Sequence, residues 1–321
     1  MEKAIAAICP LTLTDGGTTM VHPHDTPFEA ASCPKIFTSF RKAVDGLRDK
    51  MVRPFFELQA SSGVFGRYAF PKEAVADFMP EQKDYLPALQ KAHQYTPDSR
   101  TTIPYKGGES SALARLKHYC RPDGPLMTYK QTRNAMMGLD GSSHFSPFLA
   151  FGCLSARQLY WAVKEAEAKH PSGGNQDSYW LIFELLWRDY WKFLARSMDD
   201  ASAFFHLYGL DSAKSEKRWN QTRLTFEAWR DGQTGVPLVD ANMRELKATG
   251  YCSNRGRQNV ADFLAGQLHM DWRLGAEWFE AVLVDHDVCS NYGNWLYGKR
   301  FLSQCVEADM THGVYSRGRG H

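Results

Sequence analysis

Five side chains at helical spacing could form one polar site inside an aromatic wall. Trp180 is followed by Glu184, Trp187, Arg188 and Trp191 at offsets of four, seven, eight and eleven residues, so a helix would place all five on one face. A carboxylate and a guanidinium would then lie among three indole rings. This face can be an ion pair beside core tryptophans, or an aromatic cavity with two polar anchors. The spacing alone leaves both interpretations open.

A second cluster lies at a predicted helix start. Asn254 can cap a helix whose first turns carry Arg257 and Gln258 along one side. A helix N-terminus with nearby arginines favours anionic ligands. Two arginines at a helix start can equally be a solvated face, so this cluster alone does not decide the chemistry.

A third cluster follows an apolar run. Asp285 and Asp287 flank His286, and Asn291 comes one helical turn later. Such acids can pair with arginines and accept hydrogen bonds from a ring with several N–H donors, such as a flavin or a base. They could also bind a metal, but the triplet lacks distant histidines at helical spacing, and we predict no metal site. Three further tryptophans, Trp219, Trp272 and Trp295, would by themselves be ordinary core residues.

The elements that must position these residues are predicted to be helices. Apolar periodicity favours a long helix at 178–198 and shorter helices near 237–247, 255–268 and 275–284. Ser110 and Ser155 can each cap a further helix. Residues 1–105 are rich in Pro, Gly, Ser and Thr, and one helical pattern there places Ile36, Phe40, Val44 and Leu47 on one face. No strand–loop–helix unit with a glycine-rich phosphate loop occurs in that part.

The composition excludes several classes of protein. The 321 residues are 43% hydrophobic and carry a formal net charge of +2, which is enough apolar material for a large globular body without a strong overall attraction to polyanions. Charged residues interrupt every long apolar run, so no membrane helix is predicted. The seven cysteines contain no CxxC pair and are expected to be free thiols in a reducing compartment. We therefore expect a soluble intracellular protein, with cytoplasm, nucleus, plastid and mitochondrion all open.

Several motifs in a fixed order carry a family resemblance. From about Gly107 to Trp295 the sequence contains TYKQTRN, GSSHFSPFLAFGCLS, YWLIFELLWRDYW, GVPLVDANMRELKATGYCSNRGRQN and DHDVCSNYGNW. Their order resembles the photolyase and cryptochrome family, and the versions LLWRDY, SNRGRQN and DHDVCSNYGNW resemble its DASH subgroup. The resemblance implies a mainly α fold, with an all-helical domain that holds flavin adenine dinucleotide (FAD).

The resemblance also implies roles for individual residues. An ion pair over the flavin ring would come from Arg257 and Asp285, with Asp287 and Asn291 at the ring edge. The phosphate-binding residues would be Tyr129, Ser142, Ser143 and Ser146, and the cofactor would also contact Arg188 and Asn254. A chain of three tryptophans along which electrons reach the cofactor would be Trp219, Trp272 and Trp295.

The implied reaction is light-driven repair of cyclobutane pyrimidine dimers, preferably in single-stranded DNA. Glu184 would act on the damaged bases as a catalytic residue, while Trp187 and Tyr297 would stack on the extruded dimer beside Gln258. The expected partner is therefore DNA with pyrimidine dimers, and the chain is expected to be a monomer. In a non-enzymatic alternative, the same pocket serves a blue-light receptor or a nucleic-acid-binding flavoprotein. A third alternative is a helical metal-dependent phosphohydrolase built on residues 285–287.

Three departures from the family pattern shape the expected domain organisation. Residues 1–105 would be the end of an α/β antenna domain and the interdomain linker, residues 106–297 the helical catalytic domain, and residues 298–321 a divergent, partly disordered tail. The chain is thus expected to be truncated at both ends. The family's folate antenna, methenyltetrahydrofolate, therefore has little of its domain here. His144 stands where the DASH subgroup commonly has a lysine, which would weaken a charge contact to the cofactor phosphates.

Overall fold

The computed structural model describes residues 17–54, 106–198 and 219–297, together with the single residues 96, 98 and 101. Every regular element in these ranges is a helix, apart from an isolated parallel bridge between Asn220 and Met270. Among the described helices, none is both long and apolar enough to span a bilayer. The predicted mainly α fold is confirmed for this part of the chain, whereas the predicted tail at 298–321 lies outside the described residues.

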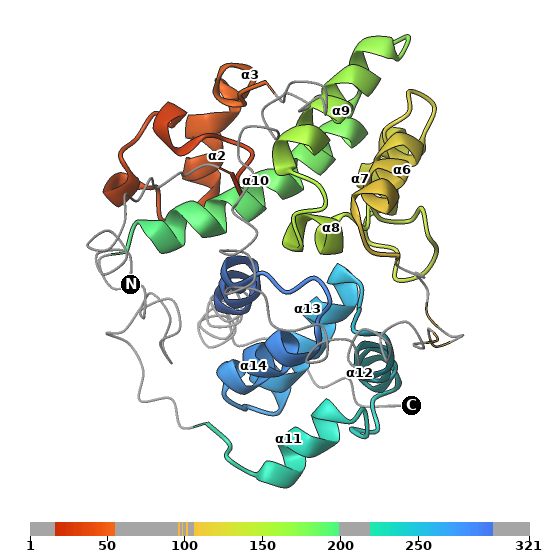
Figure 1. Ribbon diagram of the computed structural model, residues 1–321. Coiled ribbons are helices and arrows are strands. Elements are labelled where there is room, and N and C mark those ends of the chain that lie inside the picture. Colours follow the sequence, from red (N-terminus) through yellow and green to blue (C-terminus); the bar gives the residue numbers. More distant parts are fainter. Residues whose placement is uncertain are drawn as a thin grey trace, which may run out of the picture.

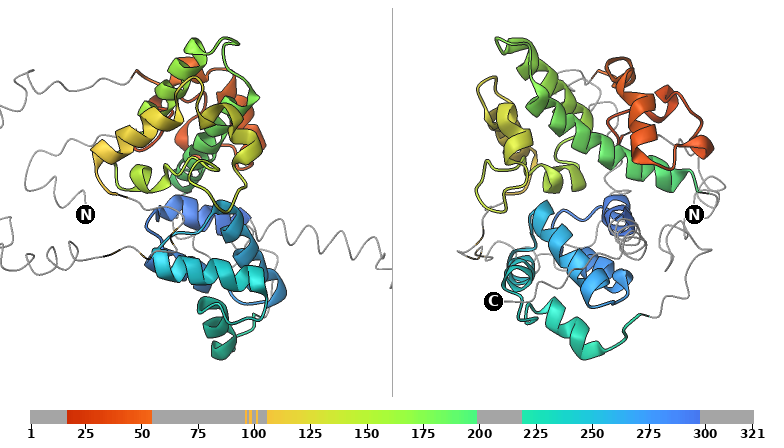
Figure 2. Two further views of the ribbon diagram at one scale, coloured as in Figure 1. Left: turned by 90° about the vertical axis from the view of Figure 1, so that its right-hand side faces the viewer. Right: turned by 180° about the vertical axis from the view of Figure 1, so that it is seen from behind.

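The helices form two groups, one above the other in Figure 1, and the turned views in Figure 2 show the same separation. The first group contains η1 (Pro23–Asp25), η2 (Ala30–Ser32), α2 (Phe37–Asp45), α3 (Arg48–Met51), α6 (Glu109–Tyr119), η5 (Pro125–Thr128), α7 (Tyr129–Thr132), α8 (Ser146–Ala150), α9 (Ala156–Lys169) and α10 (Gln176–Arg196). The second contains α11 (Arg223–Arg230), α12 (Pro237–Thr249), α13 (Asn254–Asp262), η7 (Phe263–Gln267) and α14 (Trp272–Val282). Residues 288–297 are also helical.

Helix α10 is the centre of the first group. It contacts α2, α7, α9 and the short elements η2 and η5, and it buries an apolar stripe that includes Leu181, Ile182, Leu185 and Leu186. A capping box fixes its start. The side chain of Asn175 accepts from the backbone N–H of Ser178, and the hydroxyl of Ser178 accepts from the backbone N–H of Asn175. The predicted long helix is therefore present, shifted by two residues toward the N-terminus.

The segment before α2 is fastened to α10 by a buried carboxylate. Asp189 is fully buried and accepts hydrogen bonds from the backbone N–H groups of Met20, at 3.0 Å, and Val21, at 2.8 Å. Burial raises the pKa of Asp189 to about 6, although the two hydrogen bonds act in the opposite direction. Since Met20 and Val21 are themselves fully buried, this segment belongs to the same core as α10.

One predicted helix cap is confirmed, and two were placed one or two residues late. Ser155 caps α9 in a capping box with Gln158, as its sequence indicates. Helix α6 instead follows Gly108, whose φ of 91° is open to glycine and costly for other residues, so Ser110 already lies inside the helix. Helix α13 is capped by Ser253, whose hydroxyl accepts from the N–H of Gly256 at 3.0 Å, so Asn254 is its first residue.

The apolar face predicted for residues 36–50 is half correct. Phe40 and Val44 are buried, but Ile36 and Leu47 are exposed by 56% and 43% because α2 begins after Ile36 and ends before Leu47. Phe37 is buried in place of Ile36. The prediction assumed one continuous helix, whereas the structure has a break between α2 and α3.

The second group contains a change of helix type beside the candidate site. Helix α13 continues directly into the π-helical turn η7, so the single helix predicted at 255–268 is an α-helix followed by a wider turn. Such turns are frequent at functional sites. Trp229 of α11 is fully buried beneath this junction and donates its indole N–H to the carbonyl of Val260 at 2.9 Å.

Candidate functional site

A cavity of about 640 Å³ lies in the second group, walled by α13, η7, α14 and the helical residues 288–297. Its volume is within the range of about 300–1,000 Å³ that is usual for small-molecule and cofactor sites. Eight of the predicted site residues line it, namely Asn254, Arg257, Gln258, Asp285, Asp287, Asn291, Trp295 and Tyr297. These residues are far apart in the sequence, and the packing of α13 against the turn after α14 brings them together at the cavity.

An ion pair between Arg257 and Asp285 forms part of the wall. Arg257 Nη2 donates to Asp285 Oδ2 at 2.9 Å, and Arg257 Nε donates to the carbonyl of Cys252 at 2.8 Å. Burial alone would lower the pKa of Arg257, but the charge and hydrogen bond of Asp285 raise it overall, so the guanidinium stays charged. Ser146, predicted at the phosphates, instead donates its hydroxyl to Asp285 Oδ2 at 2.6 Å.

The second oxygen of Asp285 is a buried acceptor. Oδ1 accepts no hydrogen bond from the described residues, and the side chain is only 2% exposed. A buried acceptor without a donor costs about 1–3 kcal/mol. Because Asp285 lines the cavity, a ligand with an N–H group at this wall would remove that cost.

Asp287 is held by a residue that the sequence analysis missed. Lys192 Nζ of α10 donates to Asp287 Oδ2 at 2.6 Å, and the N–H of Ser290 donates to Oδ1 at 2.9 Å. Burial would raise the pKa of Asp287, but Lys192 and this backbone bond lower it overall, so the carboxylate is ionised at neutral pH. The available signal was spacing, because Lys192 lies one helical turn beyond Arg188 on the face already identified.

Two amide side chains of the cavity wall, those of Asn291 and Gln258, already form hydrogen bonds within the protein through one of their polar atoms. Asn291 Nδ2 donates to the carbonyl of Ala276 at 2.9 Å, which directs the amide oxygen of Asn291 away from that bond. Arg255 donates to Gln258 Oε1 at 2.9 Å and to Asn134 Oδ1 at 2.8 Å. Arg255 therefore fixes Gln258 at the cavity and ties α13 to the first helix group.

Four side-chain hydrogen bonds between described residues join the two helix groups close to the cavity. They are Ser146 with Asp285, Lys192 with Asp287, Asn134 with Arg255, and His144 with Tyr251. We call these four contacts the seam. Two seam residues of the second group, Asp285 and Asp287, line the cavity, and a third, Arg255, bonds to Gln258, which also lines it.

Glu184 and Arg188 lie outside the cavity wall. Arg133 Nη1 donates to Glu184 Oε1 at 2.5 Å, and the same guanidinium lies 4.5 Å above the ring of Trp180. Burial raises the pKa of Glu184, while Arg133 opposes that rise. Arg188 donates to the carbonyl of Thr18, yet it is close enough to Asp287 to help lower the pKa of that carboxyl.

The two aromatic residues predicted to stack on a lesion are in contact with each other. The rings of Trp187 and Tyr297 meet edge to face, with centroids 5.1 Å apart and an interplanar angle of 70°. Phe37 stacks on Trp187, with centroids 3.5 Å apart. A base could enter between Trp187 and Tyr297 only if these two rings first separated.

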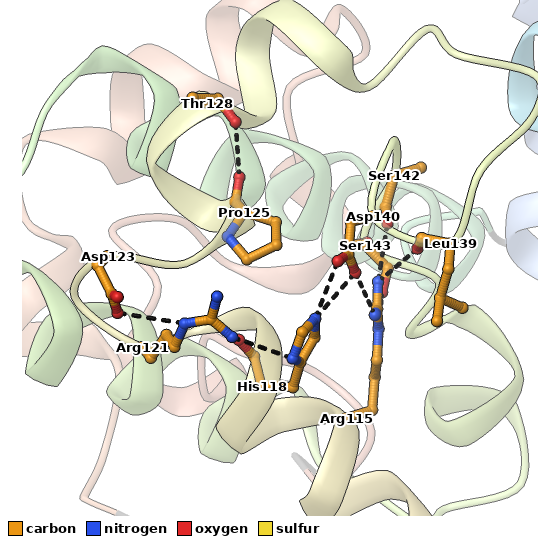
Figure 3. Close-up of polar contacts among 10 residues, drawn as sticks. All are labelled: Arg115, His118, Arg121, Asp123, Pro125, Thr128, Leu139, Asp140, Ser142 and Ser143. Carbon is orange, nitrogen blue, oxygen red and sulfur yellow. Dashed lines mark hydrogen bonds and ion pairs between the residues drawn. The ribbon is translucent and has the colours of Figure 1, made fainter.

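Tyr129, Ser142 and Ser143 lie near each other and are not among the residues that line the cavity. Burial raises the pKa of Tyr129, and hydrogen bonding by Ser142 and Ser143 opposes that rise. The loop that carries the two serines is fastened by Arg115, as Figure 3 shows. Arg115 donates to the carbonyls of Leu139, Ser142 and Ser143 at 2.8, 3.1 and 3.1 Å and to the carboxylate of Asp140 at 2.7 Å.

His144 ends that loop in a buried position. Its φ of 55° lies in the left-handed region, and Nδ1 is 2.9 Å from the hydroxyl of Tyr251. Burial, helped by the charge of Arg115, lowers the pKa of His144 to about 4. The ring is therefore neutral at pH 7, and the weaker charge contact to cofactor phosphates stays a prediction.

The three predicted electron-carrying tryptophans differ in burial. Trp295 lines the cavity and packs against α14, where a Cβ added at Gly275 would lie 2.7 Å from Trp295 Cζ2. Trp272 is fully buried in the first turn of α14. Trp219 is partly buried and precedes Asn220, whose N–H donates to the carbonyl of His269 at 2.7 Å, beside the start of α14.

The phosphohydrolase alternative finds little support in this geometry. Within residues 17–54, 106–198 and 219–297, no group of three or more His, Cys, Asp or Glu side chains is placed to hold a metal ion. Asp285 and Asp287 each pair with a cationic side chain instead.

Comparison with known proteins places the chain among flavoproteins. A family model described as the FAD binding domain of DNA photolyase matches residues 180–308. Cryptochrome DASH from Danio rerio is 46% identical over 284 residues, covering 88% of this chain and 51% of the relative. The chain thus spans about half the length of the curated relatives it matches.

Solved structures agree with that placement. The crystal structure of a cryptochrome from Synechocystis sp. PCC6803 is 41% identical, with a TM-score of 0.72, covering 95% of this chain and 57% of that one. A bacterial class III photolyase from Agrobacterium tumefaciens is 25% identical, with a TM-score of 0.63, covering 88% of this chain and 54% of that one.

Proposed function

Because the chain belongs to the photolyase and cryptochrome family, with DASH cryptochromes among its relatives, we propose that it uses blue light to split cyclobutane pyrimidine dimers, preferably in single-stranded DNA. The observation that carries the proposal is the cavity wall. Every residue of that wall falls within the match to the FAD-binding domain, and the wall includes Asp285, whose buried Oδ1 has no donor among the described residues.

FAD fits the residues present. Asp285 Oδ1 is an acceptor that a ring N–H can satisfy, and Arg257 and Lys192 keep Asp285 and Asp287 in fixed, charged pairs at the wall. Asn291 would add its amide oxygen. Bound FAD supplies light absorption and one-electron chemistry, while the protein supplies orientation and electrostatics. We further propose that Trp219, Trp272 and Trp295 carry electrons from the surface toward the cavity.

The proposed role of Glu184 is to donate a hydrogen bond to the damaged bases. Its raised pKa favours the protonated form that can donate, and Arg133 would have to release it when DNA binds. Trp187 and Tyr297 would separate to stack on the extruded dimer, with base–aromatic stacking of about 1–3 kcal/mol per base offsetting the lost ring contact. Gln258, held by Arg255, would lie beside the bases.

A second candidate function is a light receptor without repair activity. It is favoured by the direct contact between Trp187 and Tyr297, which closes the place where a dimer would stack. In this case the flavin pocket would be kept while the lesion site stays shut. We also propose the domain division at residue 105 and the monomeric state predicted from the sequence.

The test combines flavin binding with dimer splitting. Purified protein is analysed by absorption spectroscopy before and after denaturation, and then illuminated with blue light on a single-stranded oligonucleotide that carries thymine dimers. We expect stoichiometric FAD and dimer splitting. Glu184→Ala, which removes the donor, should split dimers at least about tenfold more slowly, the value of one lost hydrogen bond of about 1.4 kcal/mol.

The matched control is Glu227→Ala, which removes a carboxylate paired with Arg223 on α11, and it should split dimers as fast as the unaltered protein. If FAD is bound but no dimers are split, repair is refuted and the receptor function stands. A folded protein that binds no added FAD would refute both functions.

A further inference from the structure

A tyrosine lies against the middle member of the tryptophan set. The ring of Tyr292 meets the ring of Trp272 edge to face, with centroids 6.2 Å apart and an interplanar angle of 77°. Trp272 is fully buried and Tyr292 is 7% exposed, so protein atoms rather than water surround the contact. The two side chains come from α14 and from the helical residues 288–297 that pack beside it.

The hydroxyl of Tyr292 has a base within reach. It donates to Glu280 Oε2 at 3.0 Å, within the range of about 2.6–3.2 Å expected for a proton donor and its base. Glu280 lies eight residues after Trp272 on α14, and its side chain is 49% exposed. The other oxygen, Oε1, is 3.9 Å from His286 Nε2. A proton that reaches Glu280 can therefore continue to water.

We propose that Tyr292 and Glu280 form a proton-coupled electron donor that re-reduces Trp272 after it has been oxidised. One electron passes from the phenol of Tyr292 to the oxidised indole of Trp272. The O–H bond breaks, and the proton moves to Glu280 Oε2. The products are neutral Trp272, a tyrosyl radical and a neutral carboxylic acid, so charge and electrons balance. The inference rests on the proposed function, because electron flow along the tryptophans toward the cavity is what oxidises Trp272.

The pair needs both of its partners. A phenol that loses an electron becomes a strong acid, so oxidation of Tyr292 requires an acceptor for its proton. Before oxidation the proton stays in place, since burial raises the pKa of Tyr292 to about 12, and Glu280 and Glu277 act in the same direction. Proton transfer is thereby confined to the oxidised state, and the light-driven charge separation would end on Tyr292.

The chain offers a matched control. Tyr179 donates its hydroxyl to Asp45 Oδ2 at 2.8 Å, so it is also a tyrosine bonded to a carboxylate. Its ring contacts Phe183, which cannot pass on an electron as an indole does. The variants are Tyr292→Phe, which keeps the ring, Glu280→Gln, which keeps a hydrogen-bonding group but removes the base, and Tyr179→Phe.

The first experiment is electron paramagnetic resonance of FAD-loaded protein frozen under blue light, with and without ring-deuterated tyrosine. Deuteration narrows the signal of a tyrosyl radical and leaves that of a tryptophanyl radical unchanged. We expect a tyrosyl radical that falls at least about tenfold in Tyr292→Phe and is retained in Tyr179→Phe. In Glu280→Gln its formation should slow about a hundredfold, the usual contribution of a positioned base.

The outcomes separate the two proposals. A tryptophanyl radical without a tyrosyl radical overturns the inference and leaves the proposed function standing. If light produces neither radical, the proposed electron flow along the tryptophans fails, and pulse radiolysis with azide radicals then oxidises tryptophan directly in the same variants. The donor pair is supported if electron transfer from tyrosine to oxidised tryptophan slows in both Tyr292→Phe and Glu280→Gln. It is refuted if neither substitution changes the rate of this electron transfer.

Discussion

Replacing Lys192 by methionine should destabilise the protein by leaving Asp287 with one hydrogen bond and no cation bonded to it. Removing one partner of a fully buried ion pair costs about 3–5 kcal/mol. Here the side chains of Lys192 and Asp287 are 18% and 16% exposed, and Ser290 still donates to the carboxylate at 2.9 Å. We therefore expect a loss of about 2–3 kcal/mol in the free energy of unfolding at pH 7.

The pH dependence of that loss tests its cause. In the unaltered protein the pKa of Asp287 is lowered, so its stabilising contribution is present above the unfolded-state pKa and is lost as the pH falls through the folded-state pKa. Without Lys192, the effect of burial is opposed only by the hydrogen bond from Ser290 and the charge of Arg188, so we expect this pKa to rise and the contribution to become unfavourable as the pH rises. The difference between the two proteins should then be largest at neutral pH and shrink toward pH 3.

Urea unfolding followed by far-ultraviolet circular dichroism measures this difference. The double variant Lys192→Met with Asp287→Asn should recover most of the loss, because no unpaired charge remains. Lys247→Met, which breaks an exposed pair with Asp231 on the surface, is the control and should cost less than about 1 kcal/mol. A loss of equal size at pH 3 and pH 7, or no recovery in the double variant, would refute the reasoning.

Two further predictions concern stability. Asp189 has a pKa of about 6 in the folded state, above its ordinary value of 3.8, so its titration favours folding at low pH and this advantage is lost as the pH rises from about 4 to 6. Relative to Asp189→Asn, the unaltered protein should gain roughly 2–3 kcal/mol between pH 7 and pH 4 in urea titrations, and a pH-independent difference would contradict this. Gly275→Ala should lower the free energy of unfolding by about 1–3 kcal/mol, because the new methyl group overlaps Trp295, and near-ultraviolet circular dichroism should report the displaced indole. Gly46→Ala has open space around it and should be neutral or slightly stabilising, so equal thermal shifts in both glycine variants would count against the steric argument.

Local sequence patterns predicted helices and caps well where residues close together in the sequence determine them. The Ser155 cap depends on residues three apart, and the apolar stripe of α10 depends on one helical period. The errors arose where two local solutions compete. Gly108 and Ser253 cap their helices because their backbone angles suit the cap position. A list of residues that favour caps contains no backbone angles, so it led to Ser110 and Asn254 instead.

The candidate site was predictable only where the family resemblance supplied long-range information. It indicated that Arg257 and Asp285 pair, which the structure confirms at 2.9 Å. Lys192 was missed because its partner lies 95 residues away. Its spacing places it on the face of Arg188, but spacing alone does not distinguish it from a solvated lysine. Arg115 was missed for the same reason, since its acceptors are mostly backbone carbonyls, which leave no mark in the sequence.

The seam has a consequence for the lifetime of the chain. Because Asp285 and Asp287 line the cavity and also bond to Ser146 and Lys192 of the first group, a ligand that contacts these carboxylates in their present positions would favour the form in which the two helix groups are joined. Mass action then adds the binding free energy to the closed form, about 2.7 kcal/mol when the free ligand exceeds its Kd a hundredfold. Proteases act on opened chains, so the supply of flavin in the cell would set how long each copy of the protein survives.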